Sequence, residues 1–178
     1  MGDPLDPVRT FAIEQHAELN QKYGDDLPYD YHLKKVEEVL KRFGETSYEM
    51  LAAAWLHDVV EDCNVTVDVL KAGFGPRIAE LVWAVTNEPG ANRKERHEKT
   101  YPKTRQVKGA IRLKLADRIA NVEHCLKEKK EKGSSRLLGM YQNEFDAFVD
   151  ALFVPGQEED MWWHLKDLMI EEEQDLRQ

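Results

Sequence analysis

The segment WLHDVVEDCN (55–64) brings one imidazole and three carboxylates together within six residues, directly after an apolar run. In a helix, residues four apart share a face, and this segment contains two such pairs: His57 with Glu61, and Asp58 with Asp62. Carboxylates crowded beside an apolar helix repel one another and lose hydration unless a cation joins them. Solvated acids at a helix end would be the plainer interpretation, but the histidine directly after the apolar run favours a divalent metal site.

Two residues elsewhere in the chain are candidates for further metal ligands. His32 begins an amphipathic helical segment, and Asp117 lies in IRLKLADRIANV (111–122) on a helix face that is otherwise apolar. A carboxylate buried there without a partner would be costly. With His57 and Asp58 they make a set of two histidines and two aspartates, which suits Mn²⁺, Fe²⁺, Co²⁺ or Zn²⁺ better than Ca²⁺. HDVVED lacks the second histidine of HExxH, which excludes that metalloprotease class.

Length and composition predict one globular, cytoplasmic domain over residues 1–178. The 42% hydrophobic content is enough for a core, and no apolar run approaches the length that spans a bilayer. The N-terminus lacks the basic and then apolar layout of a signal peptide. The two cysteines form no CxxC motif, which favours a reducing compartment. The net charge of −9 argues against a protein that coats nucleic acid, so neither nucleic acid nor membrane is expected as a partner.

A basic strip interrupts this acidic chain over residues 93–114. It holds nine Lys or Arg and two Glu, or +7, which leaves −16 for the remainder of the −9 total. A local strip of this kind suits a small anionic ligand, although solvated surface is the more common role of such charges. The candidate phosphate contacts, with Lys22 and Lys114 preferred, are Lys22, Arg93, Lys94, Arg96, Lys99, Lys103, Arg112 and Lys114.

Helical periodicity dominates the chain and predicts an all-α fold, a compact bundle of about eight helices. Residues 88–103 are polar and flanked by prolines, so they are expected to be mostly loop. An apolar stripe in the last helix, formed by Met161, Trp162, Trp163 and Met169, is interpreted as core or as a homodimer contact. The helices are expected over 6–24, 30–44, 46–62, 105–130, 134–153 and 158–176, with two short ones over 64–87.

Four segments carry a resemblance to a known family: PYDYH (28–32), AAAWLHDVVED (52–62), GFGPRIAELVWAVTN (73–87) and KLADRIANV (114–122). Their order His … His-Asp … Asp resembles the HD superfamily of metal-dependent phosphohydrolases. More closely, they look like the hydrolase domain of RelA/SpoT-type alarmone enzymes, above all the stand-alone small alarmone hydrolases of the metazoan SpoT-homologue type. The similarity covers about residues 8–126, and 134–178 are expected to be additional C-terminal helices.

The resemblance implies a (p)ppGpp 3′-pyrophosphohydrolase with one Mn²⁺ ion. Such an enzyme removes the 3′-diphosphate of guanosine 3′,5′-bis(diphosphate), ppGpp, and leaves GDP, or that of pppGpp and leaves GTP. On this resemblance, the metal ligands are His32, His57, Asp58 and Asp117. The catalytic acidic pair is Glu61 and Asp62, and the substrate contacts are Lys22 and Asn121. Gln21 stands where the family often has arginine, and Leu33 stands where proline is common, so the Gln21 change puts the identity of the nucleotide in question.

Phosphoryl hydrolysis needs an activated water and neutralised phosphate oxygens, which fits these residues. Glu61 would orient the water and accept its proton, and Asp62 would support it. Two alternatives stay open. One is an HD phosphohydrolase that acts on another nucleotide phosphoester, and the other is a non-catalytic nucleotide-binding module. The intact ligand and acid positions argue against the second.

Overall fold

The fold is known from a computed structural model that describes residues 2–175. Within that range it is all-α, as expected, apart from a short antiparallel ribbon of β1 (Lys22–Tyr23) and β2 (Leu27–Pro28). None of the described helices has both the length and the apolar character needed to cross a membrane. The helices are α1 (Asp6–Glu18), α2 (Asp30–Arg42), α3 (Tyr48–Leu56), α4 (Val59–Asp62), α5 (Val67–Phe74), α6 (Pro76–Val85), α7 (Arg93–Gln106), α8 (Ala110–Lys132), α9 (Arg136–Leu152) and α10 (Glu159–Asp175).

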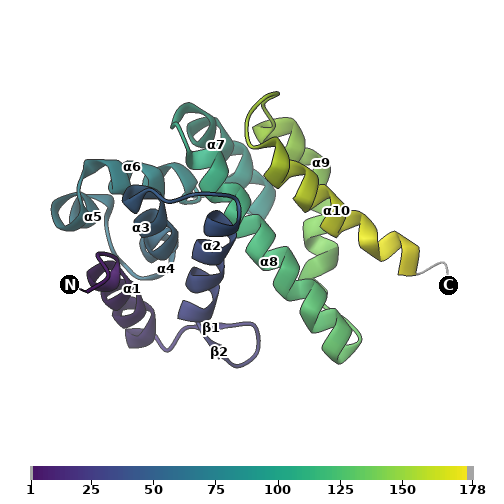
Figure 1. The fold of residues 1–178 in the computed structure, drawn as a ribbon, viewed down its shortest axis with the longest axis horizontal. Coiled ribbons are helices and arrows are strands. Elements are labelled where there is room, and N and C mark those ends of the chain that lie inside the picture. The colour runs from purple at the N-terminus through teal and green to yellow at the C-terminus, as the bar shows by residue number, and fades with distance from the viewer. Residues whose placement is uncertain (1, 176–178) are drawn as a thin grey trace.

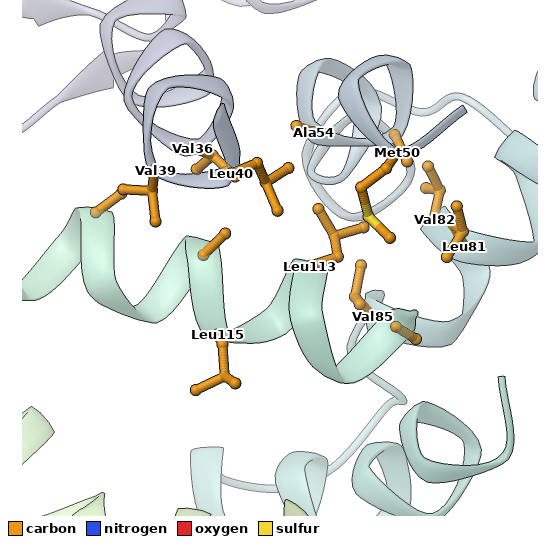
Figure 2. Close-up of a cluster of buried hydrophobic side chains, with 14 of the residues drawn as sticks. Val36, Val39, Leu40, Met50, Ala54, Leu81, Val82, Val85, Leu113 and Leu115 are labelled. Carbon is orange, nitrogen blue, oxygen red and sulfur yellow. The ribbon is translucent and has the colours of Figure 1, made fainter. Parts of the chain in front are cut away.

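Helix α8 is the axis around which the other helices are arranged. In Figure 1 it runs obliquely through the molecule, with α1 to α6 on one side and α9 and α10 on the other. It packs against α2, α3 and α6 on the first side and against α9 and α10 on the second. This position explains why the first half of α8 is buried on opposite sides: Leu113 and Leu115 are both fully buried although they point in opposite directions (Figure 2).

The largest apolar cluster lies between α8 and the helices that carry the candidate ligands. Figure 2 shows Leu113 facing Met50 of α3, with Leu81 and Val82 of α6 beside them. Side chains of α2 pack on the same face of α8. Because protein interiors are close-packed, this cluster fixes α2, α3 and α8 relative to one another, and it thereby sets the positions of the polar side chains one turn further along.

Leu113→Ala is expected to lower the free energy of unfolding by about 2–5 kcal/mol, because it removes buried methyl groups and leaves a cavity. Leu113 is fully buried, whereas Leu137, the matched control, is 42% exposed. Leu137→Ala should change stability by no more than about 0.5 kcal/mol. Chemical denaturation followed by circular dichroism measures both. Equal losses for the two variants would contradict this account of the core.

The expected loop over residues 88–103 is wrong for most of its length, because α7 begins at Arg93. The Asn92 side chain caps the helix by accepting a hydrogen bond from the Glu95 backbone N–H at 2.9 Å. Lys99 donates to the Glu95 carboxylate one turn away. Pro102 lies inside the helix, which is why the proline-flanked pattern suggested a loop.

Two expected helices are also interrupted, and both breaks matter for the site. The helix expected over 46–62 ends at Leu56, so His57 terminates α3 and α4 forms a separate turn. The helix expected over 105–130 begins only at Ala110. Gly109 precedes it with a left-handed φ of 83°, and a Cβ there would lie 2.8 Å from the Met50 Cε. The first helix ends at Glu18, before the ribbon that the periodicity did not predict.

Candidate active site

Three of the four predicted metal ligands converge at one buried point. The Nε2 atoms of His32 and His57 lie 3.3 Å apart, and the Asp117 Oδ1 lies 3.2 Å from the first and 3.7 Å from the second. Donor atoms of these three residues all lie within 4.8 Å of one another, a spacing that can hold one metal ion. His32 comes from the first turn of α2, His57 from the end of α3 and Asp117 from the middle of α8.

Asp58, the fourth predicted ligand, lies against the same two histidines. Its Oδ2 lies 3.0 Å from the His57 Nε2 and 3.7 Å from the His32 Nε2. The Tyr29 hydroxyl donates to the same oxygen at 2.6 Å, and this bond orients the Asp58 carboxylate. The break between α3 and α4 lets His57 and Asp58, which are neighbours in sequence, face one point.

The donor set fits a divalent cation. The His57 Nδ1 donates to the Ala54 carbonyl at 2.8 Å, which turns the Nε2 lone pair toward the cluster. Burial opposes ionisation of His57, but the charges of Asp58 and Asp117 outweigh it and raise the pKa of His57 well above its usual range. The pKa of Asp117 is lowered, because the hydrogen bonds that its carboxylate accepts from His32 and His57 outweigh the effect of burial. The Asp58 and Asp117 carboxylates therefore favour a positive charge at this point, and a bound metal ion would supply it.

Two further predicted residues, Asn121 and Lys114, lie beside the Asp117 carboxylate. The Asn121 Nδ2 donates to the Asp117 Oδ1 at 2.6 Å, and the Tyr23 hydroxyl donates to the Asn121 Oδ1 at 2.9 Å. The Lys114 Nζ lies 3.6 Å from the Asp117 Oδ2 and donates to the Val85 carbonyl. Lys114 and Asn121 therefore surround a ligand carboxylate and also line the cavity in front of it.

The acidic pair is held by amide groups from other segments. Glu61 accepts from the Asn87 backbone N–H at 3.1 Å and from the Asn87 Nδ2 at 3.0 Å. Asp62 accepts from the Gln21 Nε2 at 2.7 Å. Burial, together with the charge of Asp58, raises the pKa of Asp62. Amide groups thus orient Glu61 and Asp62, and among the described side chains no lysine or arginine forms an ion pair with either carboxylate.

One cavity of about 240 Å³ joins the metal cluster and the acidic pair. Tyrosine side chains form part of its wall, and cationic side chains face it from α7 and α8. A space lined in this way can take an anionic group between the cations and the acids. Its tyrosine and cationic members are Tyr23, Tyr29, Tyr141, Arg93, Lys114 and Arg118.

The basic strip contributes fewer cations to this cavity than the sequence suggested. Of the eight candidates only Arg93 and Lys114 line it. Lys22 is exposed on β1, while its neighbour Tyr23 lines the cavity. Lys103 contacts the Glu88 carboxylate, and Arg112 lies 3.4 Å from that of Glu45.

Arg118 was missed by the sequence analysis. It is buried, it lines the cavity, and its guanidinium lies 3.3 Å from the Glu144 carboxylate and 4.7 Å from the centre of the Tyr141 ring. A basic residue directly after Asp117, in a helix with so many apolar residues, was the available signal. The tyrosines of the wall had no comparable signal, because they come from distant segments.

The fold and the site together define a class: an all-α protein with a histidine and aspartate cluster that can hold a divalent metal ion. Residues 9–142 match the HD domain family, and the chain belongs to that family.

The relatives that the chain resembles in sequence include guanosine-3′,5′-bis(diphosphate) 3′-pyrophosphohydrolases. The chain is 34% identical over 138 residues to the guanosine-3′,5′-bis(diphosphate) 3′-pyrophosphohydrolase of Aquifex aeolicus, over 74% of this chain and 19% of that protein. It is 33% identical over 114 residues to the zebrafish (Danio rerio) enzyme of the same activity, MESH1, over 63% of each. The chain thus spans less than two thirds of the length of either relative.

A solved structure shares the fold along nearly the whole chain. It belongs to a metazoan SpoT orthologue that hydrolyses ppGpp, and it superposes with a TM-score of 0.78 over 97% of both chains. At 23% sequence identity, this likeness supports the fold alone. It extends over the C-terminal helices, beyond the region of the family match.

Proposed function

We propose that this chain hydrolyses the 3′-diphosphate of guanosine 3′,5′-bis(diphosphate), ppGpp, giving GDP and diphosphate, and that of pppGpp, giving GTP and diphosphate. The observation that carries the proposal is that one cavity is lined both by the acidic pair and by the histidine and aspartate cluster that can hold a metal ion. The activity named for the Aquifex and zebrafish relatives supports the choice of substrate. The buried free thiols of Cys63 and Cys125 support a reducing, cytoplasmic setting.

The proposed ligands of the cation are His32, His57, Asp58 and Asp117, and Mn²⁺ is the ion proposed. Mixed nitrogen and oxygen ligation suits this ion. When bound, such an ion supplies charge that polarises a phosphoryl group and acidifies water. Asn121 holds the Asp117 carboxylate, and the Ala54 carbonyl holds the His57 ring, so these groups fix the ligands before the substrate arrives.

The acidic pair performs the proton transfer in this proposal. Glu61, fixed by two N–H groups of Asn87, accepts the proton of the attacking water. Asp62 stands beside it in the same cavity and keeps the water in line with the phosphorus. Cationic groups on the opposite wall neutralise the phosphate oxygens, and Lys114 is the first of them. We propose Asn121 as a contact of the nucleotide and Lys22, exposed beside Tyr23, as a contact outside the cavity.

Lys114→Met is expected to raise KM about tenfold or more with a smaller fall in kcat, because it removes a buried positive charge from the phosphate wall. Lys94→Met is the matched control, since Lys94 belongs to the same basic strip but does not line this cavity. Steady-state kinetics of the two variants at one ionic strength measure the difference. Equal KM values would remove Lys114 from the substrate contacts.

Diphosphate release from ppGpp, with Mn²⁺ and with chelator, tests the proposed function. The expected result is turnover that requires the metal and yields diphosphate, which phosphorus NMR distinguishes from single phosphate. A panel of other nucleotides is the second arm, because Gln21 contacts Asp62 and leaves no guanidinium at that position. Faster turnover of another phosphoester would replace the substrate, and metal binding without any turnover would favour a nucleotide-binding module.

A further inference from the structure

Gln21 joins α1 to the acidic pair through a chain of short contacts. Its Nε2 donates to the Asp62 Oδ2 at 2.7 Å, and its Oε1 lies 2.7 Å from the His16 Nδ1. The Cys63 Sγ lies 3.2 Å from the same nitrogen. His16 is only 2% exposed, although it lies on α1, which contributes no metal ligand. Neither His16 nor Gln21 is used by the mechanism described above.

The two contacts of Gln21 determine which way its amide faces. An ionised carboxylate only accepts hydrogen bonds, so the amide nitrogen must face Asp62 and the amide oxygen must face His16. The oxygen in turn requires a proton on the His16 Nδ1. Burial lowers the pKa of His16, so the ring is neutral and carries its single proton there. The His16 Nε2 then lacks a proton, and it is buried without a hydrogen-bond partner among the described residues.

The His16 ring is fixed by packing against a side chain of the site. Its ring stacks on Tyr29 with centroids 4.2 Å apart and an angle of 26° between the planes. Tyr29 donates its hydroxyl to Asp58, as described above. One stacked pair therefore connects to the acidic pair through Gln21 and to a proposed metal ligand through Tyr29. This arrangement fixes the distance between the two halves of the site.

We propose that Gln21, oriented by the His16 ring, is a positioning residue that holds the Asp62 carboxylate in its working direction. The proposal rests on the proposed function, because it assigns Asp62 its role through that reaction. A glutamine keeps the carboxylate directed without a positive charge beside it, so Asp62 stays free to interact with water. His16 acts one step further away, as the group that prevents the Gln21 amide from turning over.

Kinetics of variants test the positioning role. Gln21→Leu is expected to lower kcat about 10- to 100-fold and to leave KM within about threefold, the loss typical of residues that orient a catalytic group. Adding Gln21→Leu to Asp62→Asn should cost nothing further, because Gln21 acts only through that carboxylate. Independent losses, or a loss confined to KM, would make Gln21 a direct substrate contact and overturn the proposal.

The orienting role of His16 has its own matched pair of variants. His16→Leu removes the N–H donor and should lower kcat about tenfold, whereas His16→Asn places an amide N–H near the Nδ1 position and should restore most of it. Gln106→Leu, an exposed glutamine at the end of α7, is the control for a loss of amide polarity. Thermal melting checks the fold of each variant, and Gln21→Met, of similar length, replaces Gln21→Leu if the latter fails to fold.

The closing experiment needs no turnover. Long-range proton–nitrogen NMR of the wild-type chain reads which ring nitrogen of His16 carries the proton. The expected result is a proton on Nδ1 at neutral pH that remains in Cys63→Ala and redistributes in Gln21→Leu. A proton on Nε2 in the wild type would overturn the proposal even if ppGpp is hydrolysed. A proton on Nδ1 without any hydrolysis would sustain the contact and refute only the proposed reaction.

Discussion

Asp117→Asn is expected to remove metal binding and to reduce kcat/KM by about a thousandfold or more. Asp117 belongs to the His32, His57 and Asp117 donor set, and its Oδ1 lies 3.2 and 3.7 Å from the two histidine Nε2 atoms. An amide keeps the shape but loses the negative charge that a divalent ion requires. A metal in this role supplies several kcal/mol of charge stabilisation, and about 4 kcal/mol corresponds to a thousandfold.

Two measurements separate this effect from unfolding. Metal content after dialysis should fall in Asp117→Asn and stay unchanged in Asp68→Asn, which alters an exposed carboxylate. Mn²⁺ should raise the melting temperature of the wild type, because an ion at 100 times its Kd stabilises the folded state by about 2.7 kcal/mol. The same addition should leave the Asp117→Asn melting temperature in place. If the Asp117→Asn variant kept full activity and the full rise in melting temperature with Mn²⁺, the metal site would not include Asp117.

The metal cluster was predictable because each ligand breaks a local pattern. His57 follows an apolar run, and Asp117 is a charge on an apolar helix face, so each is conspicuous within its own segment. Their convergence depends on α2, α3 and α8 packing together, which the resemblance implied and the apolar cluster of Figure 2 produces. Asp58 was conspicuous in the same segment as His57, and its Oδ2 lies 3.0 Å from the His57 Nε2.

The exposure of Lys22 has a cause that periodicity could not supply. Residues 22 and 23 form a strand, and successive side chains of a strand point to opposite sides. With Tyr23 directed into the cavity, Lys22 is left exposed. A two-residue strand is too short to be recognised from the sequence. The same segment places Gln21 against Asp62, a contact over 41 positions that no local pattern encodes.

Helix α7 shows how a wrong local prediction obscured part of the site. While residues 88–103 were expected to be loop, the side-chain orientations of the Lys and Arg residues in the strip could not be predicted. The helix that begins at Arg93 places this side chain in the cavity, where the Arg93 Nε lies 2.6 Å from the Glu144 carboxylate. The cap by Asn92 was readable, because asparagine before a charged first turn is a known helix start. The two prolines outweighed that signal in the sequence analysis.

Glu61→Gln is expected to lower kcat by about 10²- to 10⁴-fold and to leave metal affinity unchanged. The range is the usual contribution of a positioned general base, and the substitution removes the basic oxygen without removing bulk. Both oxygens of Glu61 accept from Asn87, so a glutamine there keeps one acceptor and brings its NH₂ group toward a donor. Pre-steady-state turnover at saturating substrate, with metal content measured on the same sample, separates the chemical step from binding.

Comparing the fall in kcat of Glu61→Gln with that of Asp62→Asn shows which carboxylate of the pair is the general base. Glu61 lies four residues beyond His57. Its carboxylate is held by the neutral N–H groups of Asn87 rather than by a cationic group, so it keeps its negative charge for the proton transfer. Burial and the Asp58 charge raise the pKa of Asp62 above that of a solvent-exposed aspartate. Glu61→Gln should cost more than Asp62→Asn, because Glu61 is the proposed base and both of its oxygens are fixed by Asn87. The reverse order would make Asp62 the base and Glu61 its support.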